Sequence, residues 1–385
     1  MTISIWQANQ NQPVRDVDFL IVGAGLVGCA AAVFAARAGR EVIITETRDI
    51  ALGASGRNAG FMITGPDTYY HHAIERYGHD RTRELWKLSE HTHAFWRSIA
   101  AQDSSVHLEQ SGSFLLAESA EEAQDLEQAA RALQADGIPV IYHTSDPFNR
   151  GYYAAIEQPW DCAVQPYELA QAIFKVSGAE LVTNNELYAI EQTAPDCVTV
   201  YTHRVIFRAR HVLLCTNAYS PRIDPYFVGK VIPTRAQCLV TQPLEAPVMR
   251  GCGYSDYGYM YYRMTFDNRL LIGGGRKNFK VQENDTTDDR ITHEVQGTLD
   301  AYLQKHFADV AALNPTIERR WAGIMGFTVD GLPLVGTLPN RPNVGFAVGF
   351  HGHGLAMGAG TAERAVDFLL NGTNPGVVDA RRLEN

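Results

Sequence analysis

The sequence predicts an α/β protein with two domains, the first built on a parallel sheet and the second of α+β type, built on a mainly antiparallel sheet. Three observations lead to this fold class. An apolar segment, a glycine-rich turn and an alanine-rich helix stand near the start of the chain, at 19–38. The same order of strand, glycine turn and helix returns at 344–370. Between them, from about Pro233, come longer β segments rich in tyrosine.

The glycine-rich turn near the start predicts a Rossmann-like domain. An apolar strand at 19–22 leads through the turn into a helix that begins at Leu26 and ends at about Ala38. The turn has the G-x-G-x-x-G spacing, in which the glycines permit the tight turn, the approach of backbone N–H groups to a pyrophosphate and close packing of the helix on the strand. These glycines are Gly23, Gly25 and Gly28, in that order.

A second strand, at 41–45, ends at Glu46, about 20 residues past the glycines. A carboxylate at that place can accept hydrogen bonds from adenosine ribose hydroxyls, and the alternative is a solvated charge at a strand end. The loop at 53–60 is rich in small residues and contains Arg57. Such a loop suits a second pass along an extended anionic cofactor, and the alternative is a simple turn.

The length and the order of these segments predict the domain organisation. At 385 residues the chain is too long for one simple core and long enough for two domains. We expect the dinucleotide-binding domain at 14–80, 162–232 and 321–385, and the substrate domain at 81–161 and 233–320. Residues 1–17 are polar and are expected to be irregular.

Charge and composition favour small-molecule partners. The formal net charge is −10, from 33 basic and 43 acidic residues, so nucleic acid and anionic membranes would be repelled. Residues 19–36 carry no charge, but Asp16 and Asp18 precede them and the glycine turn divides them, which argues against a signal peptide or a membrane span. We expect a soluble, cytoplasmic protein.

No metal site or disulfide is expected from the sequence. The six cysteines show no C-x-x-C spacing. His91 and His93 are two residues apart in a segment at 74–99 that predicts a helix, so they fall on different faces. His351 and His353 could suggest a metal pair, but no acidic or cysteine ligand is near them in the sequence. His71 and His72 lie close to the loop at 53–60, where they either line a pocket or are solvated.

The middle of the chain predicts helices at 120–135 and 166–176 and a series of strands. A strand begins at 178–182, and further short strands are expected at 198–201, 205–207 and 211–215. The last of these ends at a polar turn that we expect to contact the cofactor through Thr216 and Asn217.

A tyrosine-rich segment at 257–263 is the candidate wall of a substrate pocket. If it is one unbroken strand, Tyr257, Tyr259, Tyr261 and Arg263 share one face. The alternative is a packed aromatic sheet with an exposed arginine. Residues 270–275 repeat the strand and glycine pattern but lack the final spaced glycine and a following helix, so no second dinucleotide site is expected. A helix is expected at 291–307.

These motifs together resemble the FAD-dependent D-amino-acid-oxidase-like superfamily, which includes glycine oxidase, sarcosine oxidase and γ-glutamylputrescine oxidase. The similarity runs from about Asp18 to Leu370. Its most specific parts are Gly53-Ala-Ser-Gly-Arg-Asn-Ala-Gly60, Thr216-Asn217-Ala218, Trp321-Ala-Gly323, Asp330-Gly-Leu-Pro333 and Gly349-Phe-His-Gly-His-Gly354. The Ser-Gly-Arg-Asn form is most similar to the γ-glutamylputrescine-oxidase-like branch, which usually has Gly where this chain has Ala59.

The resemblance implies a discontinuous FAD-binding domain whose flavin faces a sheet-based substrate domain. Hydride would pass from the carbon that bears the amine to flavin N5, and the imine would then hydrolyse in water. The residues implied to line the cofactor are Gly23, Gly25, Gly28, Glu46, Ser55, Arg57, Asn58, Leu181, Gly323, Gly352, His353 and Gly354. The candidate residues on the substrate side are Tyr259, Tyr261, Arg263, Met325 and His353.

Three departures from relatives in this superfamily narrow the expected chemistry. Members with covalent flavin have a cysteine where Gly323 falls, so the FAD is expected to be non-covalent. Some members bind an α-carboxylate with an arginine two residues past Trp-Ala-Gly. This chain has Met325 at that position. The lysines of sarcosine-oxidase-like members fall at Ala356 and at about Leu271, so only modest reactivity of the reduced flavin with oxygen is expected, unless a protonated His353 or Arg57 supplies the missing charge.

The sequence leaves three functional hypotheses open. The main one is an FAD-dependent amine oxidase or dehydrogenase whose partners are a primary or secondary amine and either oxygen or another electron acceptor. The second is an amino-acid oxidase whose carboxylate-binding arginine has moved to Arg263, Arg320 or Arg276. The third is a flavin-binding subunit without turnover of its own.

Overall fold

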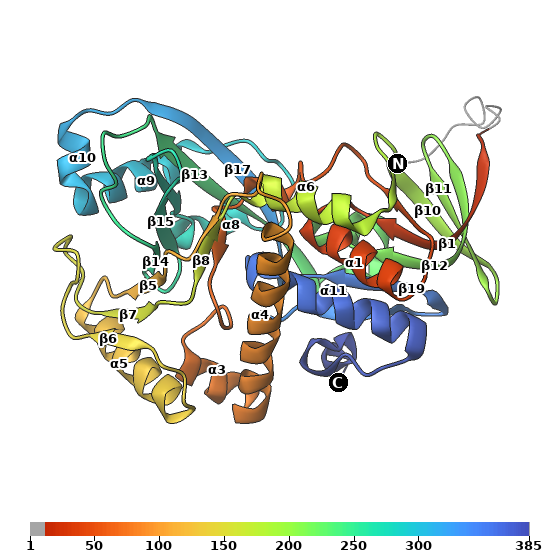
Figure 1. Cartoon of the computed structure of the whole chain (residues 1–385), viewed down its shortest axis with the longest axis horizontal. Helices are drawn as coiled ribbons and strands as arrows, with labels where there is room; N and C mark the ends of the chain where they lie inside the picture. Colours follow the sequence, from red (N-terminus) through yellow and green to blue (C-terminus); the bar gives the residue numbers. More distant parts are fainter. Residues whose placement is uncertain (1–11, 385) are drawn as a thin grey trace. The chain divides into compact units, whose positions relative to one another are not determined.

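The structure is a computed structural model that describes residues 12–384. The chain divides into two compact units, which are described separately (Figure 1). Unit 1 comprises the residues up to Gly56, 167–233 and those from Met325 onward, and unit 2 comprises 57–166 and 234–324. The assignment of cofactor binding and substrate binding to separate domains remains a prediction.

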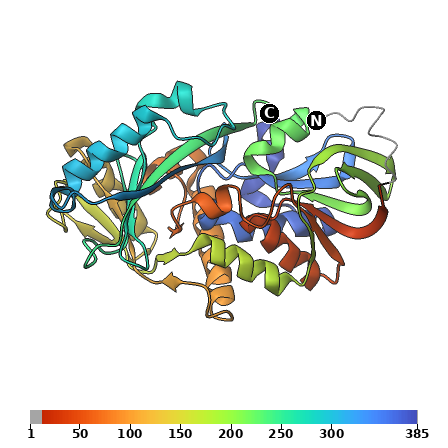
Figure 2. The same cartoon turned by 90° about the horizontal axis from the view of Figure 1, so that it is seen from above.

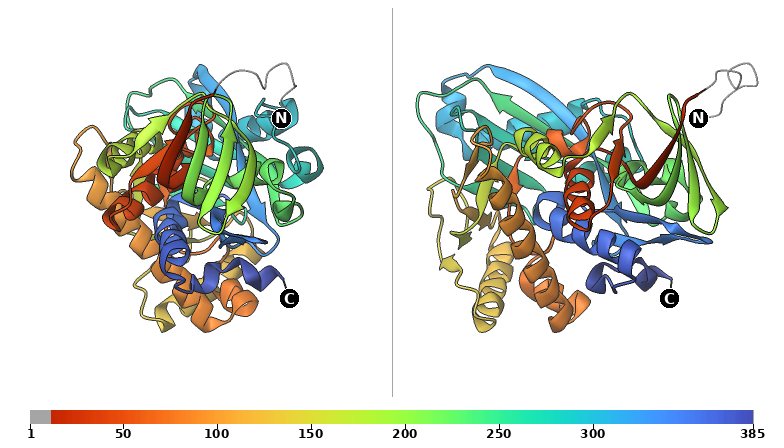
Figure 3. Two further views of the ribbon diagram at one scale, coloured as in Figure 1. Left: turned by 90° about the vertical axis from the view of Figure 1, so that its right-hand side faces the viewer. Right: turned by 45° about the vertical axis from the view of Figure 1, so that its right-hand side comes forward.

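Unit 1 is built on sheet A, in which β1 lies between β12 and β2 (Figure 3). Its strand order is β10-β11-β12-β1-β2-β9, with β19 paired to β12 and β18 to β19. The pairs β1·β12, β1·β2, β2·β9 and β12·β19 are parallel, and the β10-β11-β12 and β18-β19 pairs are antiparallel. The strands are β1 Val14–Val22, β2 Val42–Thr45, β9 Glu180–Val182, β10 Leu187–Ala194, β11 Cys197–Thr202, β12 Ile206–Leu214, β18 Leu334–Leu338 and β19 Arg341–Val348.

Two helices from opposite ends of the chain, α1 (Leu26–Arg37) and α11 (Gly354–Asn371), pack against each other in unit 1 (Figure 2). Alanine is frequent in the buried part of α1, which allows this close packing. An apolar core that includes Leu20, Phe207 and Phe346 joins β1, β12 and β19. The remaining helices are α2 Ala54–Arg57, α6 Pro166–Ser177 and α7 Ser220–Ile223, with 3-10 turns at Asn217–Tyr219, Pro225–Phe227, Gly376–Val378 and Ala380–Leu383.

The parallel strand pairs of unit 1 and the mainly antiparallel sheet of unit 2 confirm the predicted fold class. Several predicted bounds of strands and helices were wrong. Residues 14–17 belong to β1 instead of an irregular terminus, and residues 1–11 lie outside the described part of the chain. The strands expected at 205–207 and 211–215 are one strand, β12, because exposed Arg208 and Arg210 continue its alternation of exposed and buried residues. The antiparallel strand β10 was missed.

Unit 2 contains sheet C, with strand order β17-β13-β16-β15-β14-β5-β7-β6, and the small sheet B, β3-β8-β4. In sheet C the β14·β5 pair is parallel, and the β13·β16, β15·β16, β14·β15, β5·β7 and β6·β7 pairs are antiparallel. The strands of sheet C are β5 Ser113–Leu116, β6 Ile141–His143, β7 Ala155–Gln158, β13 Val231–Thr241, β14 Cys252–Ser255, β15 Met260–Met264, β16 Leu270–Gly274 and β17 Ile317–Thr328. Those of sheet B are β3 Phe61–Met62, β4 Leu108–Glu109 and β8 Cys162–Val164, and the helices are α3 Tyr70–Tyr77, α4 His79–Ala100, α5 Ala120–Ala135, α8 Lys280–Glu283, α9 His293–His306 and α10 Ala308–Ala312, with a 3-10 turn at Lys277–Phe279.

The tyrosine-rich segment is shorter as a strand than its sequence indicates. Asp256 and Tyr257 have positive φ angles of 51° and 54°, so they form a turn between β14 and β15. Tyr257 and Tyr259 therefore lie outside the strand, whereas Tyr261 and Arg263 share one face of β15. The single helical segment expected at 74–99 is likewise two helices, because Gly78 ends α3 with a φ of 84°.

The two faces of sheet C carry different side chains. On one face Tyr262 belongs to an apolar core with Leu299 and Phe307 of α9 and its C-terminal end. On the other face Tyr261 packs in smaller apolar clusters with residues that include Cys238 and Leu271. Each tyrosine lies across a glycine of the neighbouring strand, Tyr262 opposite Gly253 and Tyr261 opposite Gly273.

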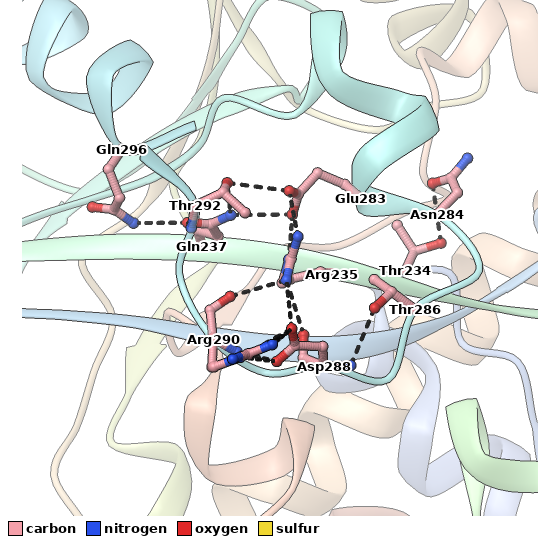
Figure 4. A network of polar contacts seen from close by, with 10 residues as sticks. All are labelled: Thr234, Arg235, Gln237, Glu283, Asn284, Thr286, Asp288, Arg290, Thr292 and Gln296. Atoms are coloured by element: carbon pink, nitrogen blue, oxygen red, sulfur yellow. Dashed lines mark hydrogen bonds and ion pairs between the residues drawn. The ribbon is translucent and has the colours of Figure 1, made fainter. Parts of the chain in front are cut away.

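A buried polar network fixes one end of β13 in unit 2 (Figure 4). Arg235 donates from Nε and Nη2 to the two carboxylate oxygens of Glu283, at 2.8 and 2.9 Å. Its Nη1 donates to the carbonyls of Asp288 and Arg290, and Gln237 Nε2 donates to Glu283 Oε2 at 3.1 Å. Because a buried ion pair contributes little net stability, the network mainly fixes the position of the 283–292 segment on β13.

Candidate functional site

The glycine turn of unit 1 has the close contacts that the motif predicts. Gly23 has a φ of 107°, and a Cβ at Gly28 would lie 1.9 Å from the carbonyl oxygen of Gly23. The N-cap residue of α1, Gly25, has no side chain to cap the helix, and the first turn contains no acidic residue. A helix N-terminus attracts a phosphate through its N–H groups and its dipole. These features fit the pyrophosphate of a dinucleotide.

Glu46 and Ser55 are bound to the same turn. Glu46 Oε2 accepts from the N–H of Ala24 at 2.8 Å, and its Oε1 accepts from the N–H of Arg48 at 2.9 Å. Ser55 Oγ accepts from the N–H of Leu26 at 2.9 Å. Each carboxylate oxygen of Glu46 retains a second lone pair, so the residue can still accept from ribose hydroxyls while it fixes the turn. The structure therefore brings Glu46 and Ser55 together with the glycines.

Asn217 connects the turn after β12 to the loop that precedes α11. Its φ is 41°, and its Oδ1 accepts from the N–H of Gly349 at 3.0 Å. A Cβ at Gly326 would lie 2.5 Å from the same oxygen. His351, which the sequence did not mark as structural, donates its N–H to the Gly326 carbonyl and accepts from the N–H of Thr328 at its Nδ1. The side-chain amide of Asn217 and the imidazole of His351 thus fix the conformation of this loop.

The other predicted residues of unit 1 lie at the ends of its strands and at α11. Leu181 is in β9, opposite Ile44 of β2. Thr216 directly precedes Asn217, and its hydroxyl contacts the Ser220 hydroxyl at 2.8 Å. Met325 lies beside the loop that precedes α11, since a Cβ at Gly352 would be 3.4 Å from its sulfur. His353 and Gly354 begin α11, whose first turn has no acidic residue and no side-chain cap.

In unit 2, Arg57 is fixed along β17. Its Nη1 donates to the Ala322 carbonyl at 3.0 Å and pairs with Asp289 at 2.5 Å. A Cβ at Gly323 would lie 3.3 Å from the Cβ of Arg57, so glycine permits this approach. The indole of Trp321 donates to the Arg57 carbonyl at 2.8 Å.

The remaining predicted residue of this loop, Asn58, closes the turn before β3. Its Oδ1 accepts from the N–H of Gly60 at 2.8 Å. The Ser-Gly-Arg-Asn segment and the Trp-Ala-Gly segment are therefore joined within the structure, although more than 250 residues separate them.

An aromatic cluster covers the face of sheet C that carries Tyr261. The Tyr261 ring lies 5.7 Å from Phe61 and 5.9 Å from Tyr254, both edge to face. Cys238 contacts the Tyr261 hydroxyl at 3.5 Å. Burial raises the pKa of the Cys238 thiol to about 12, so thiolate is scarce at neutral pH. Phe61, Tyr254 and Cys238 were not predicted from the sequence. They lie on three different strands, and no motif links them along the chain.

Tyr259 lies apart from this cluster in the turn before β15. The guanidinium of Arg276 lies 5.1 Å from the centre of its ring, and Lys280 Nζ lies 5.0 Å from it. Burial lowers the pKa of Arg276, although the guanidinium remains charged at neutral pH. Tyr259 therefore lies outside the aromatic cluster of Tyr261, although Arg276 interacts electrostatically with both tyrosines.

Arg263 is bound by backbone carbonyls. Its side chain is 3% exposed, and its Nη1 donates to the carbonyls of Gly60, at 3.1 Å, and Val164, at 3.0 Å, with a longer bond to that of Ala59. Its Nε donates to the Met264 carbonyl. Within residues 12–384 no carboxylate lies within 4.0 Å of the guanidinium. Burial lowers the pKa of Arg263, but it stays protonated at neutral pH.

Arg320 also has side-chain partners within the protein. Its guanidinium donates to Gln296 Oε1 at 2.8 Å and to Asp300 Oδ1 at 2.7 Å, both on α9. The α9 helix packs on the face of sheet C opposite to Tyr261. All three arginines proposed from the sequence thus have partners within the protein: backbone carbonyls for Arg263, Gln296 and Asp300 for Arg320, and the Tyr259 ring for Arg276.

The fold and the glycine turn together define an FAD-dependent oxidoreductase. A family model described as DAO, FAD dependent oxidoreductase, matches residues 18–368, and the chain belongs to this family. Among curated proteins, γ-glutamylputrescine oxidoreductase of Escherichia coli K12 is 25% identical over 373 residues, which cover 92% of this chain and 84% of the relative. Glycine oxidase of Bacillus subtilis is 22% identical over 371 residues, covering 93% and 94%.

Solved structures share the fold. L-proline dehydrogenase from P. horikoshii superposes with a TM-score of 0.80 at 22% identity, covering 97% of this chain and 98% of that one. Glycine oxidase from Geobacillus kaustophilus gives a TM-score of 0.79 at 21% identity, covering 92% and 94%. Both the expected family and the FAD cofactor are confirmed. In the described part of the chain, no helix has the length and apolar character needed to cross a membrane.

Proposed function

We propose that this protein is an FAD-dependent amine oxidase or dehydrogenase that oxidises the C–N bond of a primary or secondary amine lacking an α-carboxylate. The observation that supports the proposal most is that Arg263 and Arg320 already have hydrogen-bond partners within the protein. Arg263 donates from Nε and Nη1 to backbone carbonyls, and Arg320 donates from both Nη atoms to residues of α9, so neither guanidinium offers both of its Nη groups to a substrate carboxylate. Met325 leaves the usual arginine position apolar.

The energetic argument rests on the cost of an unpaired carboxylate. A buried carboxylate without a cationic partner costs several kcal/mol, which disfavours an α-amino acid against an amine of similar size. The names of the relatives include both an amine-derived substrate and glycine, so they do not decide between the two classes. The surviving rival is an amino-acid oxidase that binds its carboxylate through Arg276.

The chemistry follows from the residues that would hold the cofactor and the substrate. FAD, bound at the glycine turn with Glu46 and Ser55, supplies the hydride acceptor. Tyr261, with Phe61 and Tyr254, offers an apolar aromatic surface that favours the neutral form of an amine. Neutral amine is the form from which hydride can leave, because the protonated nitrogen has no lone pair to form the imine.

The electron acceptor is the second part of the proposal. At the position where some relatives have a lysine, Leu271 is 6% exposed and packs with Cys238 and Val240. Without a fixed cation there, reduced flavin should react slowly with oxygen, which favours a dehydrogenase. Stopped-flow mixing of reduced enzyme with oxygenated buffer tests this point. Reoxidation as fast as turnover, with stoichiometric hydrogen peroxide, would identify an oxidase instead.

The substrate class is tested by anaerobic reduction of the bound flavin. Primary and secondary amines should bleach the flavin band near 450 nm faster than glycine, D-alanine or L-proline. In Arg276→Met the rates with amines should stay within about threefold of the native enzyme. Bleaching only by α-amino acids, abolished in Arg276→Met but retained in the matched variant Arg290→Met, would establish the rival. Failure of every amine and amino acid to bleach the flavin would support a subunit without turnover.

A further inference from the structure

Three side chains of types that can ligate a metal ion converge in unit 2. His71 and His72 stand at the start of α3, and Asp125 is in α5. The Nε2 atoms of His71 and His72 lie 4.0 and 3.9 Å from Asp125 Oδ1, and one ligand atom of each residue lies within 4.8 Å of the other two. These separations are too long for hydrogen bonds, so the three groups meet without bonding one another.

His71 has polar atoms without partners. Both of its ring nitrogens are shielded from solvent and make no hydrogen bond to any residue among 12–384. Its side chain is 12% exposed, and its ring centre is 3.9 Å from that of His72. Buried polar atoms in proteins are nearly always satisfied, so two orphan nitrogens on one imidazole require a partner.

Asp125 is oriented by the same surroundings. Tyr257 Oη donates to Asp125 Oδ2 at 2.9 Å, which leaves Oδ1 directed at the histidines. The Tyr257 backbone N–H and the Tyr69 hydroxyl both donate to Glu122 Oε1, one turn earlier on α5, at 2.6 and 2.7 Å. The Tyr69 ring stacks on His72 with 6.2 Å between centres. Hydrogen bonds of this kind to a ligating carboxylate are typical of metal sites.

We propose that His71, His72 and Asp125 bind one divalent transition-metal ion with the preferences of Zn²⁺, joining α3 to α5. Two imidazole nitrogens and one carboxylate oxygen form a borderline donor set that suits this ion, with water as the fourth ligand. In a tetrahedral site the ligand atoms are roughly 3.3 Å apart, so the observed separations need only small side-chain rotations. The sequence led us to expect no metal, because Asp125 is far from the histidines along the chain.

Titration of the FAD-containing enzyme with ZnCl₂ tests the proposal. After treatment with EDTA and removal of the chelator, calorimetry at pH 7.5 should show one site per chain with a dissociation constant in the micromolar range or below. His72→Gln and Asp125→Asn should each weaken binding by at least about tenfold, and Tyr257→Phe by a smaller factor. The matched control His293→Gln changes an exposed histidine at the start of α9 and should leave binding unchanged.

The tested side chains are partly exposed, 37% for His72 and 27% for Asp125, so the variants should fold, and an unchanged flavin spectrum and melting temperature without metal verify it. X-ray absorption at the zinc edge should show two imidazoles and oxygen ligands. No binding by the native enzyme at 100-fold the expected micromolar concentration, roughly 0.1 mM, would overturn the proposal. Equal binding by the native enzyme, His72→Gln and Asp125→Asn would overturn it as well.

Discussion

Replacement of Arg263 distinguishes a structural arginine from one that binds substrate. In Arg263→Met the side chain keeps its apolar length but loses its charge and all its donors. The carbonyls of Ala59, Gly60 and Val164, which accept from Nη1 at 3.0 to 3.2 Å, then lose a charged partner in a site where the arginine was 3% exposed. Leaving buried acceptors unsatisfied costs about 1–3 kcal/mol each, partly offset because the guanidinium no longer needs to be desolvated.

The expected loss in free energy of unfolding is therefore about 3–5 kcal/mol for Arg263→Met. Arg263→Lys retains the charge and some donors, and should lose about 1–2 kcal/mol. Urea denaturation followed by tryptophan fluorescence measures both, and Arg290→Met, an arginine whose side chain is 84% exposed, is the control, expected within about 0.5 kcal/mol of the native protein.

The same variants are then assayed for anaerobic flavin reduction, with rates expressed per folded, flavin-containing protein. Because the hydrogen bonds of Arg263 go to backbone carbonyls of the protein, Arg263→Lys should keep the native preference for amines over α-amino acids. Stability within about 0.5 kcal/mol of the native protein in Arg263→Met, together with lost reduction by an α-amino acid, would refute the reasoning.

Three further predictions concern acid stability and the cofactor. Burial opposes ionisation of Glu118, but hydrogen bonds from His306 and Lys305 outweigh it and hold its pKa at about 2. The ionised Glu118 therefore stabilises the fold above pH 4.5, and this stabilisation is lost as the pH falls towards 2. Thermal melts of Glu118→Gln should show about 2–3 kcal/mol lower stability at pH 7 and a weaker dependence of stability on pH below 4.5. An unchanged pH dependence would contradict this. Acid precipitation should release FAD into the supernatant, because Gly323 stands where members with covalent flavin have a cysteine, and a yellow pellet would indicate a covalent flavin. Glu46→Gln should raise the dissociation constant for FAD, measured by flavin fluorescence, about tenfold or more, because an amide cannot accept from both backbone N–H groups; an unchanged constant would show that Glu46 only ends its strand.

Local rules made the nucleotide-binding turn predictable. Gly28 is required by its contact with the carbonyl of Gly23, and Gly23 by its own positive φ, so the spacing of the two glycines carries the geometry of the turn. Glu46 was equally predictable from the sequence, since it directly follows the next strand of the same unit. The family resemblance rested on such short motifs, which is why the fold and the cofactor could be predicted.

The features that escaped prediction depend on pairing across long stretches of chain. Tyr257 looked like a strand residue because tyrosines alternate through Arg263, but its positive φ was not visible in that pattern. The same tyrosine binds Asp125, which places an α5 carboxylate beside the histidines of α3. The partners of Arg263 are backbone carbonyls, which any sequence could supply, so no residue type could have revealed them.

The tyrosines that cross the glycines of sheet C restrict how this sequence can diverge. A Cβ at Gly273 would lie 2.1 Å from a ring carbon of Tyr261, and one at Gly253 would lie 2.0 Å from a ring carbon of Tyr262. Loss of either tyrosine would in turn uncover a strand that has no side chain of its own at that point. The members of each pair are therefore expected to covary among homologues. A mutant library that varies Tyr261 alone should return only tyrosine at that position. A library that varies Tyr261 and Gly273 together should return folded variants in which this face of the sheet has a different shape.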